Sequence, residues 1–219
     1  MNELELLTWL RGPGLAISAG IFLAGVLWRL LEVFLLGRHR DLAPPRRARG
    51  ASGLHTVVRR SLASEGMLKR SPVNYIAGYV FHIGLGLIVF FGIPHILLIE
   101  GLVGVSWPGL PSGVIELVTV LTMAAMVVLL VDRLTNPVKR FLSGFGDWFG
   151  WTVTFLPVLT GWMAVQHLVL PYTNLLVLHV LTAEILLVVL PFSKLFHTFT
   201  LFGSRWYNGK AHAHRGVPV

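Results

Sequence analysis

The sequence predicts an all-α integral membrane protein, built as a bundle of five transmembrane helices. Of its 219 residues, 54% are hydrophobic and 13% are charged, whereas a soluble domain carries roughly a quarter charged residues. The mean hydropathy is +0.72. Five apolar runs reach the length of about 20 residues that a helix needs to cross a bilayer. They leave little polar sequence between them, so we expect a single membrane domain over residues 1–219.

The boundaries of the predicted helices follow from these apolar runs. Breaks rich in glycine and proline separate them, for example at residues 106–111 and at Leu170-Pro171. The first run follows an acidic start and precedes a basic segment, the reverse of a signal peptide, so we expect it to be retained as a helix. The predicted helices cover about residues 15–37, 73–99, 114–131, 148–168 and 175–195, and a basic polar loop covers residues 38–70.

The loop charges predict the orientation. If the chain crosses five times, the basic segments at 38–70, after the third helix and in the C-terminal tail lie on one side, while residues 100–113 and 169–174 contain no Lys or Arg. The positive-inside rule then puts the N-terminus outside and the C-terminus in the cytoplasm of a bacterial inner membrane. This explains the net charge of +8, so we expect membrane lipid and an acidic partner surface rather than nucleic acid.

The absence of cysteine narrows the possible chemistry. Without a cysteine, the chain offers no disulfide, no thiolate ligand for an iron–sulfur cluster or a zinc ion, and no Cys-x-x-Cys-His site for covalent haem attachment. Any metal ion must therefore be bound by histidine or by a carboxylate.

Four histidines lie inside or at the edges of the apolar runs. They are His82 and His95 in the second predicted helix, and His179 and His197 in or just after the fifth. A polar group in hydrocarbon needs a partner, and imidazole is a common ligand of haem iron. A lone histidine there is more simply explained by a hydrogen bond to a neighbouring helix. Two pairs on two helices favour metal binding instead.

The spacing within each pair suggests how the pairs meet. On an ideal helix, the 18 residues from His179 to His197 make five whole turns and about 27 Å, so both would face one direction near opposite membrane surfaces. The 13 residues from His82 to His95 span about 20 Å but about 220° around the helix. A kink at Pro94 would turn His95 toward the fifth helix. His82 then lies level with His197 on the cytoplasmic side, and His95 with His179 on the outer side.

Three motifs resemble a known family of membrane cytochromes. They are Phe81-His82-Ile83-Gly84, then Arg133-Leu134-Thr135-Asn136-Pro137 with Gly146-Asp147, and above all His179 followed by Pro191-Phe192-Ser193-Lys194-Leu195-Phe196-His197. Over roughly residues 73–200 the chain resembles the gamma subunit of respiratory nitrate reductase and its wider family of di-haem cytochrome b subunits. The last motif, with its two histidines, is the most specific.

The resemblance implies two haem b groups, each bound by two histidines. Carried over to this sequence, His82 and His197 would bind the inner haem iron, and His95 and His179 the outer haem iron. The family exchanges electrons between quinol and a partner, so we expect quinone and cytoplasmic iron–sulfur or molybdenum-containing oxidoreductase subunits as partners. The chain would then be the quinol-oxidising, or quinone-reducing, subunit of a larger enzyme.

Two departures from the nitrate reductase subunit leave alternatives open. The interval between His82 and His95 is longer here, so either His95 or His167 is the fourth ligand. The family's lysine near the quinol site has no counterpart, and Glu116 stands there instead. Partner complexes that act on nitrate, on a disulfide as heterodisulfide-reductase-like complexes do, or on a sulfur compound are all compatible with the sequence.

Polar residues near the outer ends of the spans are candidates for quinol chemistry. We expect Glu116 and His167, with Glu100 and Tyr172 nearby, to accept protons from quinol close to the outer haem. Their side chains can all exchange a proton.

Two further residues have both a structural and a functional interpretation. Arg29 lies three residues before Glu32, where it would pair with that carboxylate or meet a haem propionate. Glu184 lies in mid-span, which is costly unless it is neutralised, paired or used in proton transfer. The alternative for the whole chain is a non-redox membrane anchor, whose histidines only form hydrogen bonds between helices.

Overall fold

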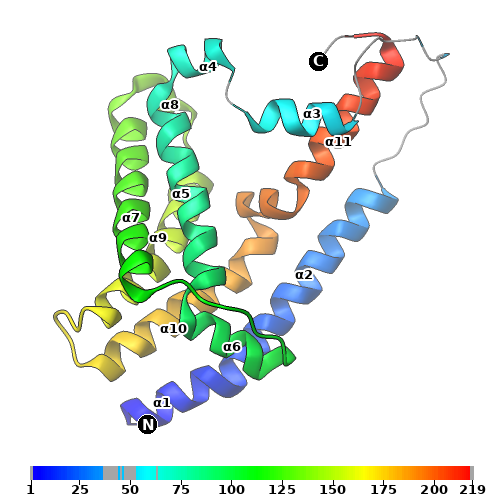
Figure 1. Ribbon diagram of the computed structural model, residues 1–219. Coiled ribbons are helices and arrows are strands. Elements are labelled where there is room, and N and C mark those ends of the chain that lie inside the picture. The colour runs from blue at the N-terminus through cyan, green and yellow to red at the C-terminus, as the bar shows by residue number, and fades with distance from the viewer. Residues whose placement is uncertain (1, 37–43, 45, 47–52, 63, 218–219) are drawn as a thin grey trace. The chain divides into compact units, whose positions relative to one another are not determined.

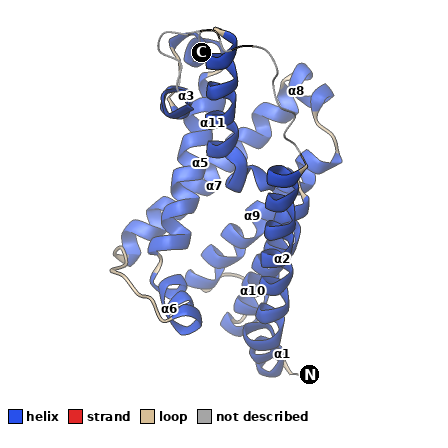
Figure 2. Cartoon of the chain, turned by 90° about the vertical axis from the view of Figure 1, so that its right-hand side faces the viewer, coloured by secondary structure: helices blue, strands red, loops and turns tan. Residues whose placement is uncertain are grey.

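The computed structural model describes residues 2–36, 44, 46, 53–62 and 64–217 (Figure 1). Figure 2 shows helices and loops, but no strand, in this part of the chain. Five of its helices are long and apolar enough to cross a bilayer, which confirms the predicted all-α class and the five spans. These candidate spans are Glu3–Leu35, Pro72–Phe91, Ser112–Thr135, Phe145–Val165 and Tyr172–Phe192.

The chain divides into two compact units. The first consists of Met1–Leu15 and Arg70–Leu186, and the second of Ala16–Lys69 and Leu187–Val219. The first unit therefore holds three of the four candidate histidines, and the second unit holds His197.

The first span begins earlier than the predicted residue 15. Helix α1 (Glu3–Trp9) continues through a π-helical turn, η1 (Leu10–Gly14), into α2 (Leu15–Leu35). The Asn2 side chain accepts a hydrogen bond from the Glu5 backbone N–H, and the Glu5 carboxylate accepts one from the Asn2 N–H, which forms a capping box. The wide turn accommodates Pro13, which cannot donate a backbone hydrogen bond.

The second predicted helix, 73–99, is divided in two. Helix α5 (Pro72–Phe91) ends at Gly92, whose backbone is extended, and α6 (Ile93–Val103) begins directly after it with Pro94 in its first turn. The sequence predicted a kink at this proline, whereas the structure has a complete break. Proline favours the first turn of a new helix, and it cannot continue the preceding one because it has no N–H to donate to the carbonyl four residues earlier.

The loop after α6 folds back onto the break. Without the break, the Phe90 carbonyl would face Pro94, which has no N–H; instead it accepts a hydrogen bond from Trp107 Nε1 at 2.6 Å. The Phe91 carbonyl accepts one from the Leu110 backbone N–H at 3.0 Å. Gly109 allows this close approach, since a Cβ there would lie 2.8 Å from an Ile93 side-chain carbon. The break therefore leaves these two carbonyls paired, as hydrocarbon requires.

Helices α7 (Ser112–Thr135), α9 (Phe145–Val165) and α10 (Tyr172–Val189) supply the remaining spans. Helix α5 packs closely on α7 at Gly84, where a Cβ would come within 2.0 Å of Thr122 Oγ1. The short helix α8 (Pro137–Leu142) follows α7 and is capped by the Asn136 side chain, while Asp147 accepts a hydrogen bond from Gly144 N at the start of α9. The Arg133-to-Asp147 motif thus includes the caps that turn the chain between two spans.

The chain is not one continuous helix from His179 to His197, as the five-turn argument assumed. A 3-10 turn, η2 (Leu190–Phe192), ends at Ser193, whose backbone is fully extended, and a second one, η3 (Lys194–Phe196), leads into α11 (His197–Arg215). Pro191 interrupts the helical hydrogen bonds, and the Ser193 side chain caps the next turn by accepting from Leu195 N. The 27 Å rise and common facing direction therefore do not apply.

The second unit is organised around α2 and α11. Gly25 on α2 leaves room for the ring of Pro191, because a Cβ there would come within 2.8 Å of it. Phe22 and Phe199 lie with ring centroids 5.9 Å apart. Helix α3 (Gly53–Ser61) packs on α11, and α4 (Glu65–Arg70) follows it. Most of the predicted 38–70 loop that the structure describes is therefore helical.

Candidate cofactor site

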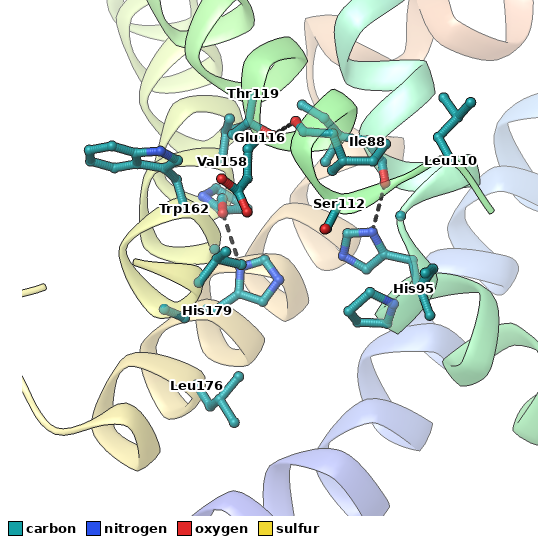
Figure 3. A pocket seen from close by; sticks show the side chains of 18 of the residues that line it. Ile88, His95, Leu110, Ser112, Glu116, Thr119, Val158, Trp162, Leu176 and His179 are labelled. Atoms are coloured by element: carbon teal, nitrogen blue, oxygen red, sulfur yellow. Dashed lines mark hydrogen bonds between the residues drawn. The ribbon is translucent and has the colours of Figure 1, made fainter. Parts of the chain in front are cut away.

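His95 and His179 come together in the first unit, although 84 residues separate them in the sequence. Their ring centroids lie 6.0 Å apart, and the ring planes are inclined by 36°. His95 comes from the first turn of α6 and His179 from α10 (Figure 3). The break at Gly92, rather than a rotation within a kinked helix, carries His95 to this place.

Each of the two rings is oriented by a backbone carbonyl. His95 Nδ1 lies 2.9 Å from the Ile88 oxygen, and His179 Nδ1 lies 3.0 Å from the Pro157 oxygen; both contacts are drawn as dashed lines in Figure 3. A carbonyl can only accept, so both contacts require the proton on Nδ1. In this tautomer, Nε2 of each ring carries a lone pair and can bind a metal ion.

The spacing of the rings fits one metal ion between them. Imidazole nitrogen binds metal ions at about 2.0–2.1 Å, so two imidazoles on opposite sides of one ion have ring centres about 6 Å apart. No group of three or more His, Cys, Asp or Glu side chains in the described chain could hold a metal ion. A haem needs only axial ligands from the protein, so two histidines suffice for it.

Helix α9 is shaped to receive the His179 ring. Gly161 faces this ring, and a Cβ at that position would lie 2.9 Å from His179 Cε1. The ring accordingly reaches the Pro157 carbonyl one turn earlier on the same helix. A second contact between these helices is made by the hydroxyls of Thr160 and Thr182, 3.2 Å apart.

The two histidines line a cavity of about 570 Å³. This lies within the range of roughly 300–1,000 Å³ that is typical of small-molecule and cofactor sites. Its wall is mostly apolar, with side chains from α5, α6, α7, α9 and α10. The apolar lining residues include Ile88, Ile93, Leu110, Ile115, Val158, Trp162, Val165 and Leu176.

Three of the four predicted proton acceptors line the same cavity. Glu116 enters it from α7, His167 from the turn between α9 and α10, and Tyr172 from the start of α10. His167 has a positive φ of 54°, and its ring centroid lies 5.0 Å from that of Tyr172. Glu100, on α6, is not among the lining residues. The cavity therefore combines two candidate iron ligands with an acid, an imidazole and a phenol.

His82 belongs to the first unit and His197 to the second. His82 Nδ1 lies 2.7 Å from the Gly78 carbonyl oxygen, four residues earlier on α5. His197 Nδ1 lies 2.8 Å from the Lys194 oxygen. Both rings thus have Nδ1 directed at a carbonyl of their own segment, which again makes Nε2 the nitrogen available for a metal ion.

Arg29 has the predicted ion pair and a second contact. Its guanidinium lies 2.7 Å from the Glu32 carboxylate. Its Cζ lies 5.6 Å from the centroid of the Phe196 ring, and Phe196 directly precedes His197. Arg29 is thus both a partner of Glu32 and a cation beside the histidine motif of the second unit.

Glu184 is buried outside the cavity. Only 7% of the residue is exposed, and its Oε1 has no hydrogen-bond partner among the described residues. Both carboxylate oxygens lie against Gly14, where a Cβ would come within 3.1 Å of Oε1.

The sequence did not indicate several parts of the site. Ser112 and Thr119 add hydroxyl groups to the cavity wall, and the carbonyls of Ile88 and Pro157 orient the rings. Pro157 is a signal that was available, because a proline inside an apolar span disturbs the helical hydrogen bonds around it. A hydrogen bond between a histidine ring and the backbone carbonyl of another helix cannot be predicted from the sequence.

A protein of Nitratidesulfovibrio vulgaris, whose name assigns it no activity, is similar to this chain. The two are 32% identical over 211 residues, which cover 94% of this chain and 92% of the relative. No family model and no solved structure matches the chain. The similarity thus extends over nearly the whole of both proteins.

Proposed function

We propose that this chain, which belongs to the same family as the Nitratidesulfovibrio vulgaris protein, is a di-haem cytochrome b subunit of a respiratory complex. It would pass electrons between the quinone pool and a cytoplasmic iron–sulfur or molybdenum-containing oxidoreductase subunit. The observation that carries the proposal is the His95–His179 pair, with ring centroids 6.0 Å apart and both Nδ1 atoms directed at carbonyl oxygens.

The two haems differ in what supports them. His95 and His179 would hold the outer haem, beside a largely apolar cavity. His82 and His197 would hold the inner haem, an assignment that follows from the motif resemblance, and Arg29 would lie near one of its propionates. Each haem, when bound, supplies one-electron transfer.

Residues of this chain would accept the protons that quinol releases when it is oxidised. Oxidation of a quinol releases two electrons and two protons, and these protons need acceptors at the site. Glu116, His167 and Tyr172 line the cavity beside the proposed outer haem, so they are placed to accept protons or to orient the quinol hydroxyls. The reverse reaction, quinone reduction, would use the same groups as donors.

The proposed orientation puts this cavity toward the outer face of a bacterial inner membrane. Reporter fusions test it, since we expect residue 55 and the C-terminus in the cytoplasm and residue 108 outside. With this orientation, quinol oxidation releases protons outside and turnover is electrogenic. A reporter at residue 108 that is active only in the cytoplasm would contradict the orientation.

The haems themselves are tested by spectroscopy of the purified chain. A reduced-minus-oxidised spectrum should show the alpha band of b-type haem, and haem extraction should yield two haems per chain. A colourless protein from cells supplied with haem would contradict the proposal and favour a non-redox anchor. A quinol-analogue inhibitor should shift the spectrum of the outer haem, and a shift confined to the inner haem would contradict the placement of the quinol site.

A further inference from the structure

Helix α3 has an apolar stripe on its exposed side. Leu54, Val58 and, just past the end of the helix, Leu62 follow at four-residue intervals, so they lie along one face. Their exposed fractions are 61%, 53% and 67%. The exposed side chains of His55 and Arg59 flank this stripe. An apolar face bordered by basic side chains is typical of helices that lie in a membrane surface.

The opposite face of α3 packs on α11 within the second unit (Figure 1). A Cβ at Gly53 would lie 2.7 Å from the Trp206 ring, so the two helices are in close contact there. Thr56 is completely buried. The Arg205 guanidinium donates a hydrogen bond to the Ser61 hydroxyl at 2.7 Å. These contacts fix the rotation of α3, and its apolar stripe therefore faces away from α11.

The connection of α11 to the fifth span keeps α3 within reach of the membrane surface. The span ends at Phe192 and α11 begins at His197, a distance of at most about 17 Å for an extended chain. Arg205 and Trp206 lie about 13 Å along α11 from its start. The part of α11 that holds α3 is therefore never more than about 30 Å from the end of a transmembrane helix.

The Lys and Arg side chains of α3 and α11 are not balanced by acidic side chains on these two helices. Neither α3 nor α11 contains an Asp or Glu, and together they carry five Lys and Arg residues. Lys210 Nζ lies 5.2 Å from the centroid of the Trp206 ring, a combination of cation and aromatic ring that suits the boundary between headgroups and water. The five basic residues are Arg59, Arg60, Arg205, Lys210 and Arg215.

We propose that α3 is a membrane-surface helix that binds anionic lipid and is held in position by α11. Leu54, Val58 and Leu62 enter the apolar edge of the leaflet, while Arg59 meets anionic headgroups. An acidic protein surface would satisfy the charges as well, but a stripe of aliphatic side chains close to the end of a span favours lipid. The proposal does not depend on haem binding.

Site-directed spin labelling tests this placement, because the chain has no cysteine of its own. Two single variants of the full chain are compared, Val58→Cys in the stripe and Arg60→Cys, which lies about 200° around the same helix. Both are placed in lipid nanodiscs of phosphatidylcholine, with or without phosphatidylglycerol. We expect the label at 58 to be accessible to oxygen and shielded from a water-soluble nickel chelate, and the label at 60 to show the reverse.

The anionic part of the proposal has its own variant. Phosphatidylglycerol should increase the shielding of the label at 58 several-fold, and Arg59→Glu in the Val58→Cys background should abolish that increase. A label at Leu23→Cys, on the exposed side of the α2 span, should remain in lipid when combined with Arg59→Glu, which shows that the protein is still inserted.

Two results would overturn the inference. If the label at 58 is as accessible to the nickel chelate as the label at 60 in both kinds of nanodisc, the stripe does not lie in lipid. It would then be a surface for a protein partner. If it is shielded equally with and without phosphatidylglycerol, and Arg59→Glu changes nothing, the helix has no preference for anionic lipid.

Discussion

The two proposed histidine pairs of this protein differ in how their members are positioned. His95 and His179 lie in one unit, each oriented by a carbonyl outside its own helix, with a cavity beside them. His82 and His197 belong to different units, and Nδ1 of each is directed at a carbonyl of its own segment. The members of the proposed outer pair therefore lie within one packed unit, whereas those of the proposed inner pair belong to different units.

Alanine variants of the outer pair should have the largest effect. His179→Ala and His95→Ala should each lower the haem content from two per chain to one, because a single remaining imidazole does not hold the outer haem through purification. Quinol oxidation should be lost with it. Haem extraction and redox titration of the purified variants measure both effects.

His167→Ala is the matched control for the proposed outer pair, since His167 lines the same cavity, whereas the ring 6.0 Å from that of His179 belongs to His95. It should retain both haems. If His167→Ala empties the outer site and His95→Ala spares it, the fourth ligand lies after α9 and the assignment of His95 is wrong.

Variants of the inner pair sharpen the comparison. His82→Ala and His197→Ala should each remove the inner haem and leave the outer one, which is visible as loss of one component in the redox titration. Electron transfer to a partner should stop, while the outer haem is still reduced by quinol. Loss of both haems from either variant would show that the outer site is not self-contained in its unit.

Glu116→Gln should have an intermediate effect, on rate and not on haem content. General base catalysis typically contributes about 10²–10⁴-fold to a rate, so quinol oxidation should fall by roughly 100-fold while both haems remain. Glu100→Gln is the control, because Glu100 does not line the cavity. A loss of activity in the Glu100 variant with none in the Glu116 variant would move the proton acceptor out of the cavity.

The smallest expected effect concerns the packing of α5 on α7. Gly84→Ala puts a methyl group where Thr122 Oγ1 lies, and such overpacking costs about 1–3 kcal/mol. Gly86→Ala, two residues later on α5, meets nothing within 4 Å and gains the same helix propensity. Thermal unfolding in detergent should therefore separate the two variants, and equal stabilities would mean that α5 and α7 are not tightly packed at Gly84.

The number of spans could be predicted from sequence because it depends on the length of apolar runs alone. The sequence also placed His95 level with His179, and the structure brings their rings together by a different local change, a break in the helix instead of a kink. Proline and glycine indicate that a helix is disturbed, but they do not indicate whether it bends or breaks. The facing direction predicted from the 18-residue interval between His179 and His197 was wrong, because the prediction assumed a continuous helix through Pro191 and Ser193. The cavity was beyond prediction, since its wall comes from five helices whose side chains meet only after folding.

The hydrogen bonds that seal the break at Gly92 have a consequence for biogenesis. Two backbone carbonyls there are satisfied by Trp107 and Leu110, which follow α6 in the chain. During synthesis, α5 and α6 emerge before these donors do, and unsatisfied carbonyls cost several kcal/mol each in hydrocarbon. We therefore expect α5 and α6 to remain in the aqueous translocation channel until the segment up to Leu110 has followed, so that they enter the lipid together with it as one unit.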